Sequence, residues 1–156
     1  MVRRLQAEIR QTKPFATLEA EAYLNLLRTA DALFRGGEAL LKPLQLSPPQ
    51  YNVLRILRGA YPGGLACREV AERLLTKDPD ITRLMDRLEH RGLITRARNQ
   101  KDRRVITTRI TPDGQQLLKQ LDKPMLEMQE QQLGHLGQRK LRYLINLLET
   151  VRQKAG

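Results

Sequence analysis

The segment Asp78–Asp113 constrains the fold most, because a capped helix pattern is followed directly by a hairpin pattern. Asp78 and Pro79 predict the helix start, with an acceptor side chain at the N-cap and proline at the first helical position. Apolar residues then recur at helical spacing as far as Leu88, and Gly92 is the predicted C-cap. The fold must therefore pack a short helix beside the hairpin that follows Gly92.

A basic hairpin follows this helix. Residues 93–98 and 105–110 read as strands, and the polar residues 99–104 form the turn between them. Within residues 83–109, lysine and arginine occupy positions 83, 87, 91, 96, 98, 101, 103, 104 and 109, against acids at 86, 89 and 102. A helix and a basic hairpin form a winged helix-turn-helix, in which the helix enters the major groove of DNA and the hairpin reaches the adjacent minor groove. The segment therefore predicts a DNA-binding protein.

The overall charge agrees with a polyanionic partner. The 156-residue chain has 28 lysines and arginines against 17 acids, a net charge of +11. A solubilising surface explains the total charge equally well, but its clustering in one structural unit favours nucleic acid. The single cysteine, Cys67, excludes an intramolecular disulfide. No apolar run approaches the roughly 18 residues of a membrane span, and no signal-peptide core is visible, so we expect a cytoplasmic protein without a membrane partner.

Three further helices are predicted before this segment. Thr17 caps a long helix that extends to about Leu41. Ser47 and Gln50 have the spacing of a capping box and begin a second helix. A short third helix over residues 67–75 takes the place of the first helix of a helix-turn-helix.

Two more helices follow the hairpin. Thr111 and Pro112 begin a long helix that Pro124 should kink. The final helix covers residues 138–153 and has an apolar stripe made of Leu141, Leu144, Ile145, Leu148 and Val151. The predicted fold is therefore mainly α with a small β-hairpin wing.

With these elements in place, the sequence resembles the MarR family of bacterial winged-helix transcription factors. The resemblance spans roughly residues 20–153, and 47–54 are similar to that family's second helix. The other matching residues are Leu65, Glu69–Leu74, Thr82–Glu89, Arg91–Ile94, Asp102–Arg104 and Ile110–Gly114.

The resemblance implies a homodimer with a helical dimerisation base and two winged helix-turn-helix lobes. The expected segments are a flexible basic N-terminal arm (1–16), the N-terminal helix of the dimerisation base (17–46), the DNA-binding lobe (47–111) and C-terminal dimerisation helices (112–156). Such proteins usually bind a pseudo-palindromic operator, most often as repressors, and many release DNA when a small-molecule effector or an oxidant arrives. A two-fold dimer presents two recognition helices about 34–36 Å apart, one turn of B-DNA.

Three residues near the start of the recognition helix are candidates for DNA contact. Thr82 and Arg83 lie in its first turns, and Arg87 lies one turn further along the same face. Arginine pairs with guanine O6 and N7 in the major groove. The alternative is that Arg87 and its acidic neighbours are ordinary solvated charges. Members of the family often open this helix with small hydroxyl residues. Here Pro79 and Asp80 stand at those positions, so the phosphate contact is not carried over to them.

The turn of the wing supplies the second set of candidates. Lys101, Arg103 and Arg104 form a basic tip, and the resemblance implies that Asp102 holds one arginine while an arginine enters the minor groove. Either Arg103 or Arg104 fits that role. The first wing strand adds two candidates for phosphate contact, Arg96 and Arg98.

Evidence for a sensor is weaker. Cys67 is better explained as a small buried residue, because the peroxide-sensing branch of the family has its cysteine in the first helix. His90 and His135 lack companion ligands at metal-binding spacing, so neither metal nor cofactor is expected. The resemblance is consistent with an effector cleft between base and lobe, although its candidate walls are more often core residues: Leu26, Ala30, Phe34, Tyr51 and Leu54.

Two other classes of function compete with a regulator. An enzyme is not expected, since no phosphate loop, nucleophile elbow or paired-acid motif is present. A non-specific architectural DNA-binding protein would have the same charge, because phosphate neutralisation is independent of sequence. The specificity ratio separates the two, since a regulator prefers its operator by about a thousandfold or more.

Overall fold

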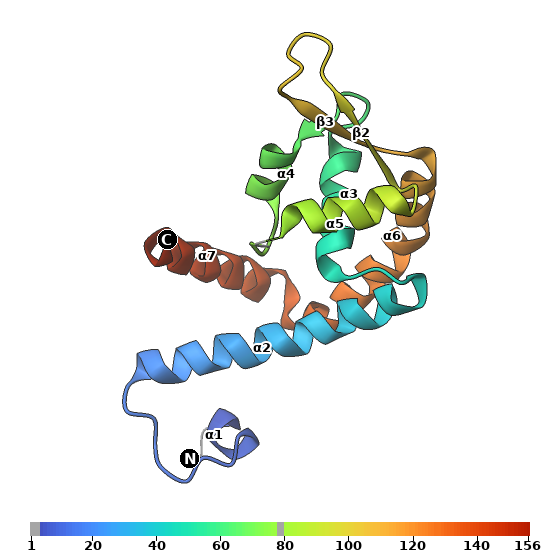
Figure 1. Ribbon diagram of the computed structural model, residues 1–156. Coiled ribbons are helices and arrows are strands. Elements are labelled where there is room, and N and C mark those ends of the chain that lie inside the picture. Colours follow the sequence, from blue (N-terminus) through green and yellow to red (C-terminus); the bar gives the residue numbers. More distant parts are fainter. Residues whose placement is uncertain (1–3, 78–79) are drawn as a thin grey trace. The chain divides into compact units, whose positions relative to one another are not determined.

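A computed structural model describes residues 4–77 and 80–156, and its elements are mainly helical, as predicted (Figure 1). The chain forms two compact units, Met1–Gly37 and Glu38–Gly156. The order of elements is α1 (Arg4–Glu8), α2 (Leu18–Leu41), the 3₁₀ helix η1 (Lys42–Leu44), α3 (Pro48–Gly59), β1 (Leu65–Ala66), α4 (Cys67–Arg73), α5 (Ile81–His90), β2 (Ile94–Arg98), β3 (Ile106–Ile110), α6 (Pro112–Leu133), the 3₁₀ helix η2 (Gly134–Leu136) and α7 (Gly137–Ala155).

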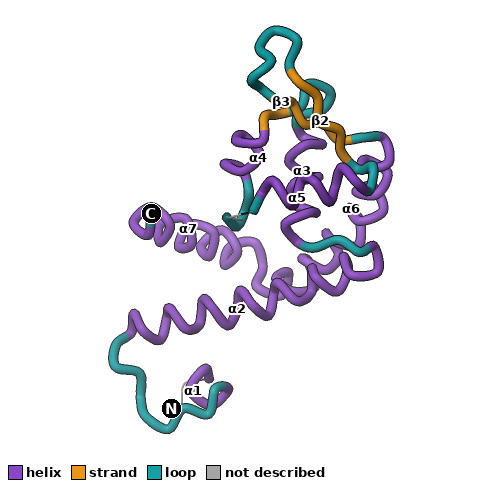
Figure 2. Tube along the Cα trace, viewed as in Figure 1, coloured by secondary structure: helices purple, strands orange, loops and turns teal. Residues whose placement is uncertain are grey.

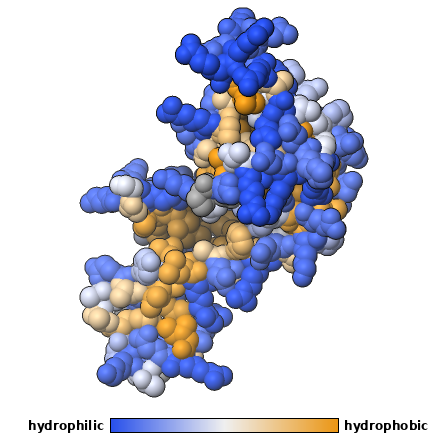
Figure 3. Space-filling view, in the orientation of Figure 1, coloured by the Kyte–Doolittle hydropathy of each residue, from blue (hydrophilic) through white to orange (hydrophobic). Residues whose placement is uncertain are grey.

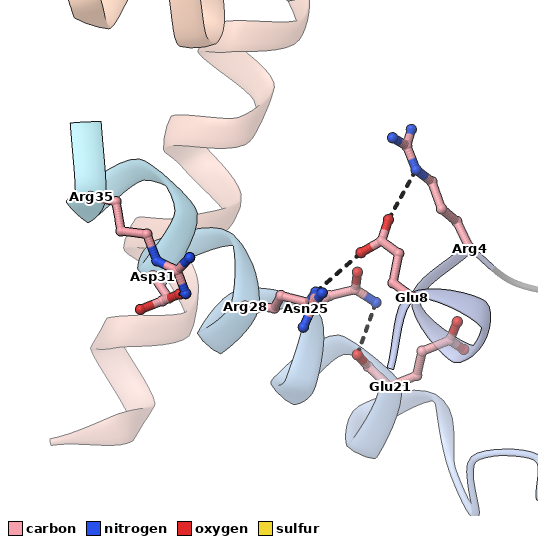
Figure 4. A network of polar contacts seen from close by, with 7 residues as sticks. All are labelled: Arg4, Glu8, Glu21, Asn25, Arg28, Asp31 and Arg35. Carbon is pink, nitrogen blue, oxygen red and sulfur yellow. Dashed lines mark hydrogen bonds and ion pairs between the residues drawn. The ribbon is translucent and has the colours of Figure 1, made fainter. Parts of the chain in front are cut away.

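The N-terminal unit contains a helix that the sequence analysis did not predict. The expected loose arm includes α1, in which Leu5 is buried. The Glu8 carboxylate accepts hydrogen bonds from Arg4 of the same helix, at 3.0 Å, and from Arg28 of α2, at 3.2 Å (Figure 4). A five-residue helix is too short to be stable alone. It depends on the burial of Leu5 and on the Glu8–Arg28 pair, which no local sequence pattern encodes.

The three strands form an antiparallel sheet in the order β1-β3-β2 (Figure 2). The predicted hairpin is confirmed, and each strand begins one residue later than expected. In its register Ile94 pairs with Ile110 and Arg96 pairs with Thr108. Strand β1 was not predicted, because two residues carry no detectable alternation; it exists by pairing Leu65 with Thr108.

The core of the Glu38–Gly156 unit joins helices α3, α4, α5 and α6 to the root of the hairpin. Val53, Leu57, Met85, Leu88 and Leu118 are among its fully buried side chains. The helical spacing of apolar residues that predicted α5 is thereby confirmed, and α3 buries one side in the same core. Burial of this kind contributes about 1.5–3 kcal/mol for each large apolar side chain.

The core continues into α6, the first helix after the hairpin. Leu118, Leu121 and Met125 of α6 are buried in it. Arg58 of α3 also forms two hydrogen bonds of 2.9 Å to the Asp122 carboxylate of α6. The Arg58 guanidinium lowers the pKa of Asp122, which keeps this pair ionised. The N-terminal half of α6 therefore packs into the same core as α3.

Predicted caps explain where helices α2, α3 and α6 begin. Thr17 accepts a hydrogen bond from the Ala20 amide, and Ser47 and Gln50 form the reciprocal capping box of α3. The start predicted at residues 78–79 lies outside the described residues. In the structure α5 begins at Ile81, and the Asp80 carboxylate accepts from the Arg83 amide, so Asp80 takes the capping role that was assigned to Asp78.

The junction between the wing and α6 leaves no room for a side chain at Gly114. The Thr111 hydroxyl donates to the Gly92 carbonyl at 2.6 Å and accepts from the Gly114 amide at 3.1 Å. A Cβ atom at Gly114 would clash with the Leu93 carbonyl oxygen and lie 2.7 Å from a side-chain carbon of Ile110. The end of the hairpin and the start of α6 are therefore packed backbone against backbone.

We predict that Gly114→Ala lowers the free energy of unfolding by about 1–3 kcal/mol, because the new methyl group overpacks this junction. Gly134→Ala is the matched control, since nothing lies within 4 Å of its Cβ position and its φ of −61° is helical. The control should be neutral or stabilising by up to about 1 kcal/mol. Urea denaturation followed by circular dichroism measures both, and equal stability of the two variants would contradict the prediction.

Candidate nucleic-acid interface

Helix α5 presents one polar face to solvent and buries the other. Leu84, Met85 and Leu88 are buried, as predicted, and Thr82 and Arg83 are exposed in the first turn. Residues 83, 86, 87 and 90 are spaced by three, one and three positions, which places them on one side of a helix. The burial of the apolar side therefore fixes which side chains are available to a partner.

A groove of about 570 Å³ runs along this exposed side. Its lining contains three guanidinium groups, one imidazole, one amide and one carboxylate, from Arg83, Arg87, Arg91, His90, Gln50 and Asp86. This excess of donors and positive charge suits a phosphate backbone or the acceptor-rich edge of guanine. His90 and Arg91 were not among the predicted DNA contacts. Their spacing from Arg83 and Arg87 was the signal that would have identified them.

The C-terminal end of α5 is tied to the segment that precedes α3. Arg91 donates to the carbonyl oxygens of Gln45, at 2.8 Å, and Leu44, at 2.9 Å. Gln45 has a φ of +54° and terminates η1. Because a guanidinium supplies several donors in one plane, Arg91 satisfies two free carbonyls at once. The Arg91 guanidinium is thereby held in place at one end of the groove.

The wing tip is a compact turn organised by Asp102. One Asp102 carboxylate oxygen accepts from the Arg104 amide at 3.1 Å and lies 3.5 Å from the Arg104 guanidinium. The Asp102 carbonyl accepts from the Val105 amide at 3.0 Å, which closes the turn. The resemblance implied that Asp102 holds an arginine, and Arg104 is the one it holds in the structure. Within residues 4–77 and 80–156, the Arg103 side chain makes no hydrogen bond or ion pair, and Lys101 is also exposed.

Arg96 and Arg98 differ in their surroundings, although both were predicted to contact phosphates. The Arg96 side chain is only 23% exposed and its guanidinium pairs with the carboxylates of Asp86 and Glu89 on α5. The hydrogen bond from Arg96 lowers the pKa of Glu89, and the same bond raises the pKa of Arg96. Arg98 is exposed and donates to the Arg103 carbonyl at 3.1 Å. Asp86 and Glu89 are therefore not simply solvated charges, and Arg96 is engaged inside the lobe.

The candidate effector-cleft residues have unlike environments. Leu54 is fully buried in the core and Tyr51 is partly buried on α3. Leu26, Ala30 and Phe34 are exposed on α2, in the N-terminal unit. The five residues therefore do not share one environment, and the structure does not identify an effector site.

Three further possibilities are a reactive Cys67, a metal site and a membrane-spanning helix. Cys67 is partly buried at the first position of α4. Across the described parts of the chain, no three metal-ligating side chains come together. No helix in those parts is long and apolar enough to cross a membrane.

Comparisons with known proteins agree with this geometry. The MarR family model matches residues 46–106, which include α3 through β2, the wing turn and the first residue of β3. A solved MarR transcription factor from Planctomyces limnophilus is 44% identical, covers 88% of this chain and 99% of its own, and superposes with a TM-score of 0.67. The organic hydroperoxide resistance transcriptional regulator of Bacillus subtilis is 31% identical over 88% of this chain and 93% of its own length.

A further solved relative is the PcaV transcriptional regulator of Streptomyces coelicolor in complex with its natural ligand. It is 25% identical, covers 92% of this chain and 100% of its own, and has a TM-score of 0.75. The exposed basic face of α5, the basic wing and these near full-length matches lead to one assignment. The chain belongs to the MarR family of winged helix-turn-helix, DNA-binding transcriptional regulators.

Proposed function

We propose that this regulator is a repressor that binds a pseudo-palindromic operator as a homodimer and is released by a small-molecule effector. The observation that carries the proposal is the exposed basic side of α5 beside a wing whose tip is basic as well. Figure 3 shows hydrophilic side chains covering the wing tip at the top of the view. The dimer represses transcription if it occupies DNA that the transcription machinery needs. Because bacterial operators lie in the cytoplasm, we propose that the protein acts there.

Helix α5 is the element proposed to enter the major groove. Arg83 and Arg87 are exposed and separated by one helical turn, so their guanidiniums reach neighbouring base pairs on one side. A bidentate contact of arginine to guanine contributes about 1–3 kcal/mol of discrimination. Thr82, also exposed, is proposed to contact a base edge or phosphate near the start of the helix.

The wing is proposed to reach the minor groove with an arginine at its tip. Asp102 holds Arg104 by its backbone amide and its guanidinium, which shapes the turn. The Arg103 side chain, exposed and without such a tie inside the described chain, is the better candidate for insertion. Lys101 and Arg98 are proposed to contact the flanking phosphates.

Dimerisation is proposed from apolar surface on the terminal helices. Helix α7 has no buried residue in the single chain, and its Tyr143, Ile145, Leu147 and Val151 are exposed. In the N-terminal unit, α2 exposes Tyr23, Leu26, Leu27 and Phe34. Amphipathic helices with uncovered apolar residues mark a protein-protein interface. A second copy of the chain is the proposed occupant, since a two-fold dimer also doubles the DNA contacts.

An effector is proposed by analogy with a relative. The solved PcaV regulator is described in complex with its natural ligand. The alternative to a specific regulator is a non-specific architectural DNA-binding protein, which the same charge distribution allows.

The test of the proposed function is selection of duplexes from a random library by the purified protein at about 150 mM salt. Enrichment of an inverted repeat with half-site centres about 10 base pairs apart is the expected result. Binding without enrichment of any sequence would support the architectural alternative and contradict a specific regulator.

We predict that Arg103→Ala weakens binding to the selected duplex by about 1–3 kcal/mol and lowers the slope of log affinity against log salt by about one. The reason is the loss of one cation at the minor groove. Fluorescence anisotropy over a salt series measures both quantities. Gln100→Ala, an uncharged neighbour in the same turn, is the control. Affinity unchanged by Arg103→Ala and by Arg103→Ala/Arg104→Ala would contradict the proposed role of the wing.

We also predict that the protein is a dimer at micromolar concentration and that Ile145→Glu shifts it to monomer. Ile145 is 53% exposed in the single chain, so a glutamate there leaves the fold of the chain intact but places a charge in the interface. Asn146→Glu is the matched control, because it adds the same charge to an exposed position away from the apolar stripe of α7. Sedimentation velocity measures all three proteins, and a monomeric wild type would contradict the proposed dimer.

A further inference from the structure

Strand β2 is tied to the recognition helix by a cluster of charged side chains at the root of the wing. The Arg96 backbone amide donates to one Glu89 carboxylate oxygen at 3.0 Å, and the Arg96 guanidinium donates to the other at 2.9 Å. The same guanidinium nitrogen donates to Asp86 at 2.5 Å. We call Asp86, Glu89 and Arg96 the wing-root cluster.

The position of this cluster links two surfaces that were proposed to meet the same DNA. Arg96 lies in β2 opposite Thr108 of β3, three residues before the wing turn begins. Asp86 lines the groove along α5, between Arg83 and Arg87. One end of the cluster is therefore in the wing and the other is among the side chains proposed to read the major groove.

The cluster also offsets part of the negative charge on α5, because one guanidinium pairs with two carboxylates. Asp86 is 57% exposed and Glu89 is 40% exposed, so without a cation both would repel phosphates. Arg96 brings one positive charge to two carboxylates and is largely withdrawn from solvent itself. Because charge-assisted bonds are directional, they also hold the strand at one angle to the helix.

We propose that Arg96 is a positioning residue that, through Asp86 and Glu89, holds the wing at the angle at which the wing tip and the recognition helix engage one duplex together. This inference rests on the proposed sequence-specific binding of DNA. When two contact surfaces are held rigidly, the second contact requires no further loss of conformational freedom, and affinity rises without a new contact. Arg96 itself then touches no DNA.

The alternative role of Arg96 is a direct phosphate contact, as the sequence analysis expected. The two roles differ in the effect of Asp86→Asn. If Arg96 contacts a phosphate directly and Asp86 is only a charge facing DNA, neutralising Asp86 raises the affinity for DNA, because a repulsive carboxylate has been removed. If Asp86 holds Arg96, the same substitution lowers affinity, because the wing loses one of its ties to α5.

The experiment compares Asp86→Asn with wild type by fluorescence anisotropy on the most enriched duplex from the selection. We expect Asp86→Asn to bind about tenfold more weakly. Glu127→Gln is the matched control: Glu127 is 56% exposed, pairs with Lys123 within α6, and loses the same charge, so its affinity should equal or exceed that of wild type. Affinity of Asp86→Asn equal to or above that of wild type would overturn the proposal.

A double-mutant cycle separates positioning from any other cause of weaker binding. Asp86→Asn and Arg96→Lys are each combined with Arg103→Ala/Arg104→Ala, which removes the contacts that the wing delivers. We expect both root substitutions to change affinity less than about twofold in that background, since a wing without its arginines no longer benefits from being positioned. Equal losses in both backgrounds would overturn the proposal and support a direct contact by Arg96.

A measurement without DNA distinguishes failure of this inference from failure of the proposed function. Amide hydrogen exchange over residues 94–110 should be faster in Asp86→Asn and Arg96→Lys than in wild type, and unchanged in Glu127→Gln. Unchanged exchange in both root variants would overturn the cluster's role in the wing even if DNA binding is specific. If no duplex is enriched, the proposed function fails, and faster exchange would still establish that the cluster holds the wing.

Discussion

Burial of one side of α5 is the constraint on which the interface depends. Leu84, Met85 and Leu88 enter a core built by α3, α4, α6 and the root of the hairpin, so the helix cannot rotate without exposing them. The basic side faces outward as a direct consequence. Polar contacts then hold each end of the helix. The Asp80 side chain caps its start, and just after its last residue Arg91 donates to the Leu44 and Gln45 carbonyls.

Positive charge in this lobe serves different purposes at different positions. Arg83 and Arg87 line an open groove. Arg91 lines the same groove and also donates to backbone carbonyls, and Arg58 pairs with Asp122. A net charge of +11 attracts any polyanion at long range but carries no sequence information. In the proposed interface, carboxylates position Arg96 and Arg104, whereas the Arg103 side chain has no such tie within residues 4–77 and 80–156. We propose that Asp86, Glu89 and Asp102 shape the interface by holding arginines.

Local signals predicted the elements of this lobe well. The capping box at Ser47 and Gln50, the Thr111 cap and the hairpin within one residue at each strand are all confirmed, because each depends on neighbours within a few positions. Helix α1 and strand β1 were missed, because each is too short to be stable without a distant partner. The start predicted for α5 at residues 78–79 lies outside the described residues, and Asp80 caps the helix that begins at Ile81. The roles of the candidate DNA contacts remain predictions.

The sequence by itself determined the fold class, the basic character of the helix and wing, and the family, because periodicity, caps and motif order are local properties of the chain. Only the tertiary structure decided what each charge does. It pairs Arg96 with carboxylates seven and ten positions away and brings Arg91 to carbonyls more than 40 residues earlier. Such pairings depend on distances between elements, which follow from how the apolar faces pack and not from the order of residues along the chain.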